Sequence, residues 1–307
     1  MLSGLSVTQI ALLLIAGVLL DLLLGETRRW HPLVGFGNLA QWIERRSNRG
    51  TWRIARGTFA WSLAVIPLTA LASVAIHFGG LAAHALLLYF AIGLRSLREH
   101  NLPIADALER DDLAGARALT ARIVSRDTAH ANPTDLAKAS TESLLENGND
   151  AVFGALFWFI VAGGPGVVLF RLANTLDAMW GYRTPRFLLF GRVAARIDDV
   201  LNFVPARLTA LSYVLLADQP RCAWHCWKSQ APAWSSPNAG PVMASGAGAL
   251  GVVLGGAAIY DGVTENRPPL GFCAAPESED IRRAWGLVRA TTLLWLAMMT
   301  LLGILYA

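Results

Sequence analysis

AVFGALFWFIVAGGPGVVLF, residues 151–170, is the stretch of sequence that decides how this chain folds. It is apolar and close to the length of about 20 residues that crosses a bilayer. The run Gly163-Gly164-Pro165-Gly166 breaks it in the middle, as is typical of a re-entrant hairpin. Irregular backbone at membrane depth is tolerated only where protein or a water-filled cavity covers it. We therefore expect a hairpin that brings both flanking polar segments to one site. The alternative is a full crossing, which would separate them.

The composition of the whole chain indicates an integral membrane protein. Of 307 residues, 54% are hydrophobic and 16% are charged, with a mean hydropathy of +0.43. Average soluble chains carry about 25% charged residues. The sequence therefore predicts an all-α, polytopic helical membrane protein. Its best spanning segments are 5–24, 58–77, 80–97 and 287–306, with a tight turn at 77–80 joining the second to the third.

The distribution of arginine predicts how the chain is oriented. Loop 26–56 contains seven arginines, which the positive-inside rule places in the cytoplasm. The two predicted spans that follow this loop return the chain to the same side, so segment 98–150 also lies in the cytoplasm. We expect a small helical subdomain there. The expected location is the bacterial inner membrane, with the active site facing the cytoplasm. We treat residues 1–307 as one membrane-embedded domain and 171–241 as its polar active-site block. The Gly/Ala-rich run 242–260 suits close helix packing, but its topology stays open.

The polar block holds a density of charge that is unusual next to a bilayer, where charge is costly unless it is paired or used. Arg171, Asn174 and Asp177 repeat at steps of three, so they share a helix face. Asp198-Asp199 follows closely on arginines of the same segment. Such a set forms either structural salt bridges or a metal and phosphate site. The turn Ser236–Gly240 needs no more than a structural explanation.

A second set of acids precedes the broken apolar segment. Glu142, Glu146 and Asp150 recur every four residues, so they form one stripe if the helix continues past Gly148. Carboxylates in this arrangement suit Mg²⁺, which also takes substrate phosphates as ligands. The alternative is a solvated acidic helix face. The sequence has no phosphate-loop lysine motif, no GxGxxG and no GxSxG, so a nucleotide would need another kind of site.

Several short motifs, in order along nearly the whole chain, resemble the CobD/CbiB family of cobalamin biosynthesis, the adenosylcobinamide-phosphate synthases. One departure is Ala155, at a position where the family usually has proline. The matching stretches are Asp21–Gly25 with His31-Pro32, Arg126-Asp127-Thr128, Glu142–Asn147 with Asp150, Asn174–Asp177 with Gly181-Tyr182, Gly191-Arg192, Ala195–Asp199 with Asn202, Pro205-Ala206-Arg207 and Ser236–Gly240.

The resemblance implies a membrane enzyme that joins adenosylcobyric acid to (R)-1-amino-2-propanol O-phosphate, with ATP and Mg²⁺ as cosubstrate and metal. Our hypothesis for the chemistry is activation of the carboxylate as an acyl phosphate, followed by attack of the amine. Membrane lipid and later enzymes of the pathway are further expected partners. A nucleic-acid partner is not expected, because no binding module is recognisable and the net charge of +4 is modest.

Candidate roles follow for individual residues. The expected catalytic residues are Glu142, Glu146, Asp127 and Asp177. The expected substrate and phosphate ligands are Arg126, Arg171, Asn174, Arg192, Arg196, Asn202, Arg207, Ser236 and Asn238. The expected metal ligands are Glu142, Glu146, Asp150, Asp198 and Asp199. The competing reading is a non-catalytic corrinoid carrier, an AmpE-like sensor or a scaffold. A carrier would want polar residues within several spans, yet the four good spans hold almost none.

Overall fold

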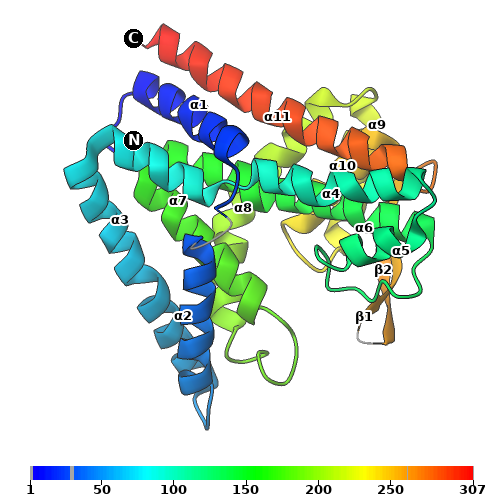
Figure 1. Ribbon diagram of the computed structural model, residues 1–307, viewed down its shortest axis with the longest axis horizontal. Coiled ribbons are helices and arrows are strands. Elements are labelled where there is room, and N and C mark those ends of the chain that lie inside the picture. Colours follow the sequence, from blue (N-terminus) through cyan, green and yellow to red (C-terminus); the bar gives the residue numbers. More distant parts are fainter. Residues whose placement is uncertain (1–2, 28–30, 261, 307) are drawn as a thin grey trace. The chain divides into compact units, whose positions relative to one another are not determined.

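The computed structural model describes residues 3–27, 31–260 and 262–306 (Figure 1). The chain divides into two compact units, each of which is built from separate stretches of sequence. Unit 1 comprises Met1–Gly93, Asp150–Asn202 and Leu296–Ala307, and unit 2 comprises Leu94–Asn149 and Phe203–Trp295. The predicted subdomain 98–150 falls almost wholly in unit 2, and the predicted block 171–241 is divided between the units after Asn202. The domain limits expected from the sequence therefore stay predictions.

Unit 1 consists of helices. They are α1 (Val7–Leu24), α2 (Pro32–Ser47), α3 (Arg53–Ala91), α7 (Gly154–Trp180) with most of the π-helical turn Asn149–Phe153, the first part of α8 (Arg192–Leu216) and the end of α11 (Ser278–Leu305). A capping box formed by Ser6 and Gln9 starts α1. The core forms where small and large residues of α3, such as Ala64 and Val65, pack against Leu172 and Leu176 of α7.

Two of these helices are folded back at a glycine. The backbone of α3 leaves the helical conformation at Gly80 (φ 53°, ψ −137°), and that of α7 does so at Gly163 (φ 64°, ψ −149°). In α7 the two arms lie side by side, because a Cβ on Gly154 of the first arm would come within 2.2 Å of the Phe170 ring of the second arm. The break expected at residues 163–166 is therefore confirmed, and it forms a hairpin.

The hairpin tip of α7 is held by a histidine from α3. His84 is buried, and its Nδ1 accepts a hydrogen bond of 2.9 Å from the backbone N–H of Gly164. The ring of His84 also meets Phe159 edge to face, with 6.1 Å between ring centroids. A backbone N–H freed by the break thus has an acceptor inside the protein, as the interior of a membrane protein requires.

Five helical stretches in the described part of the chain are long and apolar enough to cross a membrane: Val7–Leu24, Arg53–Glu109, Pro133–Trp180, Arg192–Leu216 and Ser278–Leu305. The helices predicted over 5–24, 58–77 and 287–306 are confirmed as parts of α1, α3 and α11. The predicted segment 80–97 is interrupted, because α3 ends at Ala91 and Ile92 is extended. The N–H of Gly93 donates instead to the carbonyl of Ala151, so the helix does not continue there.

Unit 2 combines short helices with a small sheet. The elements are α4 (Leu94–Glu109), α5 (Leu113–Thr120), α6 (Pro133–Gly148), α9 (Pro220–Gln230), a 3₁₀ turn (Ala231–Ala233), α10 (Ala239–Leu250), β1 (Val253–Tyr260) and β2 (Val263–Gly271), with the rest of α8 and α11. Two of these helices begin at a side-chain cap, since Asp112 caps α5 and Asn132 caps α6. Ala107, Ala116 and Leu136 form the core between α4, α5 and α6.

The expectation of an all-α fold needs one correction. Segment 242–260 is not one packed helix, because α10 ends at Leu250 and the left-handed Gly251 turns the chain into an antiparallel hairpin, β1–β2. A bulge interrupts the register between Gly255 and Gly256, both of which have positive φ. These glycines allow a backbone conformation that other residues rarely adopt, which is why the Gly-rich composition suits a strand here.

Candidate functional site

The hairpin of α7 gathers polar residues from both of its ends in unit 1. We call Asp150, Asn174, Asp198 and Asn202 the acid–amide cluster. Asn202 Nδ2 donates to Asp150 Oδ1 at 3.2 Å and to Asp198 Oδ2 at 3.2 Å, and Asn174 Nδ2 donates to Asp198 Oδ1 at 3.3 Å. Arg171 Nη1 lies 3.4 Å from both the Asp150 carbonyl and Asn174 Oδ1. Residues on either side of the broken segment therefore meet, as the hairpin interpretation requires.

Negative charge is concentrated around the acid–amide cluster. Asp150, Asp177 and Asp198 lie close enough for their charges to interact unfavourably, and Asp199 also acts on Asp177. Asp198 is 7% exposed and Asn202 is 1% exposed, so water does little to screen this repulsion. Buried carboxylates are stable only when a proton, a cation or hydrogen bonds compensate their charge. The two asparagine amides supply hydrogen bonds, and a bound cation would supply charge.

The cluster can be compared with what a magnesium ion needs. Mg²⁺ in phosphoryl-transfer sites is bound by one or two carboxylates plus substrate phosphates and water. Asp150 and Asp198 share the amide of Asn202, so two carboxylates converge from different helices. In the described ranges, no three His, Cys, Asp or Glu side chains are grouped so as to hold a metal by themselves. The residues present thus fit a metal that is shared with substrate phosphates.

Two exposed arginines of α8 lie beside the acids of that helix. Arg192 and Arg196 are one helical turn apart, and Arg196 Nη1 lies 3.7 Å from Asp199 Oδ2. Both arginine side chains are exposed, and the guanidinium fork is suited to phosphate. Asp199 is therefore paired with an arginine, and this contact agrees with the structural salt bridge that the sequence left open.

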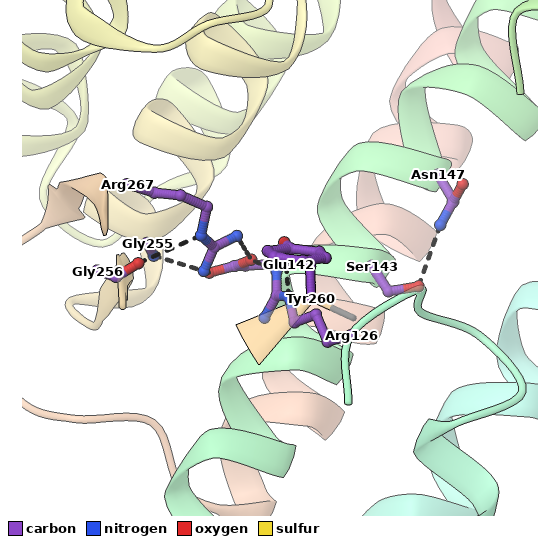
Figure 2. Close-up of polar contacts among 8 residues, drawn as sticks. All are labelled: Arg126, Glu142, Ser143, Asn147, Gly255, Gly256, Tyr260 and Arg267. Atoms are coloured by element: carbon purple, nitrogen blue, oxygen red, sulfur yellow. Dashed lines mark hydrogen bonds and ion pairs between the residues drawn. The ribbon is translucent and has the colours of Figure 1, made fainter. Parts of the chain in front are cut away.

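Glu142 lies in unit 2, where two arginines bind it (Figure 2). Arg126 Nη2 and Arg267 Nη1 both bind Oε2, the latter at 2.9 Å, while the Gly255 N–H donates to Oε1 at 2.7 Å. Arg267 Nη2 adds a longer bond of 3.3 Å to Oε1. A carboxylate has about four acceptor positions, and these contacts use them. Glu142 therefore anchors the β1–β2 hairpin, and its predicted metal and catalytic roles stay predictions.

Arg126 is held from a second side by the hairpin. Its Nε donates to the Tyr260 hydroxyl at 3.2 Å, and Arg267 Nε donates to the Gly256 carbonyl at 3.2 Å. Burial lowers the pKa of Arg126, but the charges of Glu142 and Tyr260 and the hydrogen bonds to both together outweigh burial and raise the pKa above its usual value. Sequence reasoning missed Tyr260 and Arg267. The dipeptide Asp261-Gly262 between two short apolar-polar runs is the signal that could have indicated a hairpin there.

The remaining predicted acids lie apart from this ion pair. Glu146 is half-buried on α6, and Asp127 is exposed, with Oδ1 accepting the N–H of Ala129. Asp127 also borders a cavity of about 300 Å³, together with Arg126 and Lys138. The catalytic roles of Asp127 and Glu146 stay predictions.

Three other predicted binding residues meet each other in unit 2. Arg207 Nη1 donates to Asn238 Oδ1 at 2.7 Å, and Nη2 donates to the Pro237 carbonyl at 2.9 Å. Ser236 Oγ accepts the N–H groups of Asn238 and of Ala239, the first residue of α10. Arg207 thus fastens the 236–240 turn to α8, so the structural explanation of this turn suffices for the contacts seen.

Comparison with known proteins identifies the family. Residues 14–288 match a family model described as CobD/Cbib protein. The chain belongs to the CobD/CbiB family. A protein from Stutzerimonas stutzeri named "Cobalamin biosynthesis protein CobD" is 58% identical over 305 residues, covering 97% of this chain and all of the relative.

More distant CobD proteins also align over most of their length. The protein of the same name from Chromobacterium violaceum is 52% identical over 94% of this chain and 95% of its own length. One from Mycobacterium tuberculosis is 39% identical over 89% of each chain. No solved structure matches the chain. Membership of the CobD/CbiB family gives this protein a role in cobalamin biosynthesis.

Proposed function

We propose that this CobD/CbiB family member catalyses the ATP-dependent ligation of adenosylcobyric acid with (R)-1-amino-2-propanol O-phosphate. In the first step a carboxylate oxygen of the corrinoid attacks the γ-phosphorus of ATP, and ADP leaves. In the second step the amine nitrogen attacks the acyl phosphate carbon, a proton leaves the nitrogen and inorganic phosphate departs. The product is the amide adenosylcobinamide phosphate. This route is needed because a free carboxylate is a poor electrophile for an amine in water.

The observation that carries the proposal is the pair of carboxylates of Asp150 and Asp198 on the amide of Asn202. Phosphoryl transfer depends on positioning and on stabilising the charge that spreads over the transferred group. When bound between these carboxylates, Mg²⁺ would neutralise phosphate charge. Asn202 holds the two acids at a fixed separation, with bonds of 3.2 Å to each. Such preorganised groups need little rearrangement during the reaction.

Other residues of unit 1 receive matching roles. Arg192 and Arg196 are exposed and would bind phosphate oxygens through their planar forks. Asp177 lies on the same helix face as Arg171 and Asn174, close to the acid–amide cluster, so we assign it the proton of the attacking amine. Arg171 and Asn174 position the cluster, because they contact the carbonyl of Asp150 and the carboxylate of Asp198.

The arginine-rich loop 26–56 supports a location in the bacterial inner membrane with this site facing the cytoplasm, where ATP is present. Five helical stretches of spanning length support the membrane part of this proposal. Later enzymes of the cobalamin pathway remain proposed partners in the same membrane.

The assignment of the site is tested with one isosteric substitution and a matched control. Asp198→Asn removes one charge from the cluster, while Asp218→Asn makes the same change at an exposed residue after α8. Both proteins would be purified in detergent, checked for folding by thermal unfolding, and assayed with adenosylcobyric acid, the aminopropanol phosphate and MgATP. We expect the first variant to lose turnover at least about 100-fold, an effect of ~2.7 kcal/mol, and the control to keep it. Equal turnover of the two folded variants would overturn the assignment.

A further inference from the structure

Unit 1 contains an apolar groove of about 460 Å³, separate in chemistry from the acid–amide cluster. It is lined by the first half of α2, by both arms of α3 and by the second arm of α7. Phe36, Leu68, Ala72, Phe90 and Leu172 form much of the wall. Arg171 is the one charged residue among those that line the groove.

Arg171 has an unusual position for a guanidinium. Its Nε is buried without a hydrogen-bond partner, and no salt bridge to it occurs among the described residues. Its Nη1 reaches two neutral oxygens, the Asp150 carbonyl and Asn174 Oδ1, each at 3.4 Å. The carboxylates of Asp150 and Glu26 act on this charge, but neither forms a salt bridge with it, so burial of the guanidinium is only partly compensated. The wall of the groove therefore offers a donor and a positive charge to an anion.

The groove is continuous with an apolar surface of the protein. Leu39 is 38% exposed and Leu71 is 61% exposed, and both line the groove. Val34 on α2 is 65% exposed beside them. Further along α2, Trp42 is exposed and Arg46 stacks on its ring at 4.0 Å. A helix with an apolar side, a tryptophan and basic residues at its end is typical of the membrane interface.

We propose that this groove binds one anionic phospholipid. An acyl chain fills the apolar part, and a phosphate oxygen accepts a hydrogen bond from Arg171 Nε. The rim formed by Leu39 and Leu71 is apolar, so a chain enters from the bilayer without crossing a polar surface. A corrinoid or a nucleotide does not fit, because its many polar groups would face an apolar wall without hydrogen bonds, which is costly. This inference shares Arg171 with the proposed ligase site but needs no catalytic step, and its readout is lipid binding alone.

The test uses native mass spectrometry of the full-length protein released from detergent. The probes are dioleoyl phosphatidylglycerol and dioleoylglycerol, which have the same chains but differ in the phosphate group. A hydrogen bond to a charged group is roughly twice as strong as one between neutral groups. We therefore expect the phospholipid to bind the native protein about tenfold more tightly or better, as ~1.4 kcal/mol is one factor of ten. Equal binding of the two lipids would contradict the proposal.

Three variants locate the site. Ala75→Trp fills the groove from its exposed rim and should abolish the tight binding, whereas Ala70→Trp changes an exposed alanine of the same helix outside the groove and should keep it. Arg171→Met should reduce phosphatidylglycerol binding to the level of dioleoylglycerol. Tight binding that survives Ala75→Trp would overturn the proposal, and thermal unfolding of each variant checks that it is folded.

Discussion

Asn202 donates one hydrogen bond of 3.2 Å to Asp150 Oδ1, and thereby joins α8 to the residue from which the hairpin of α7 departs. The same amide reaches both oxygens of Asp198 at 3.4 and 3.2 Å. One neutral side chain thus fixes two acids that would otherwise repel each other. This relationship links the break in the apolar segment to the candidate site.

Substituting Asn202 tests how much the cluster depends on this amide. Asn202→Leu removes one hydrogen-bond donor from each of two carboxylates, and a hydrogen bond to a charged group is worth about 1.5–3 kcal/mol. We expect a lower unfolding temperature in detergent and a loss of turnover. Asn147→Leu is the control, since Asn147 is exposed and its amide donates to Ser143 Oγ. Equal stability of the two variants would contradict the importance of the Asn202 contacts.

The glycine at the tip of the α7 hairpin should not tolerate a side chain. Gly163 has φ 64° and ψ −149°, a region that is essentially restricted to glycine, where another residue costs on the order of 1–3 kcal/mol. A Cβ there would also come within 2.6 Å of His84 Cε1. Gly163→Ala should therefore lower the unfolding temperature clearly. In the control Gly286→Ala, the new Cβ meets nothing within 4 Å and lies in α11, so no loss is expected. Equal unfolding temperatures of the two variants would contradict the claim that a side chain at position 163 strains the backbone.

Removing the charge of Glu142 should destabilise unit 2. Glu142→Gln leaves Arg126 and Arg267 close together without a carboxylate, and breaking a buried ion pair in this way costs about 3–5 kcal/mol. We expect strongly reduced unfolding temperature or yield. Glu265→Gln, on the exposed part of β2, should have little effect. If Glu142→Gln were as stable as Glu265→Gln, the anchoring role would be refuted.

A pH dependence is expected from Glu44 of α2. Burial raises the pKa of this carboxyl, but hydrogen bonds from Arg186 and Asn48 and the charges of Arg186 and Arg45 together outweigh burial and hold the pKa below its ordinary value of 4.5. Because the folded-state pKa is lowered, the contribution to stability is present above about pH 4.5 and is lost as the pH falls through the folded-state pKa. Unfolding temperatures measured from neutral pH downward should fall less steeply in Glu44→Gln. Parallel curves for variant and native protein would contradict this.

Several features could be predicted from local sequence signals. The caps Asp112 and Asn132 start helices because their side chains accept backbone N–H groups, which depends on near neighbours alone. The Gly163–Gly166 break is likewise local. A hairpin returns the chain to its starting point, so the break predicts that the polar residues on its two sides, such as Asp150 and Arg171, lie close together.

Other features depend on partners distant in sequence. Glu142 is bound by Arg267 and by the Gly255 N–H, which belong to a hairpin more than a hundred residues further along the chain. Periodicity placed Glu142 and Glu146 on one helix face but said nothing about what that face meets. The hairpin itself was hidden, because Gly- and Ala-rich sequence also suits helix packing in membranes.

The central claim, ATP-dependent amide ligation, is tested most directly by one turnover measurement on the purified, detergent-solubilised protein. Adenosylcobyric acid, (R)-1-amino-2-propanol O-phosphate and MgATP would be supplied, with the corrinoid product identified by mass spectrometry and nucleotide release followed in parallel. The account predicts adenosylcobinamide phosphate with one ADP and one phosphate per product. Release of AMP and pyrophosphate would show that the activated intermediate is an adenylate and not an acyl phosphate. Bound corrinoid without any product would contradict the ligase and favour a carrier or scaffold.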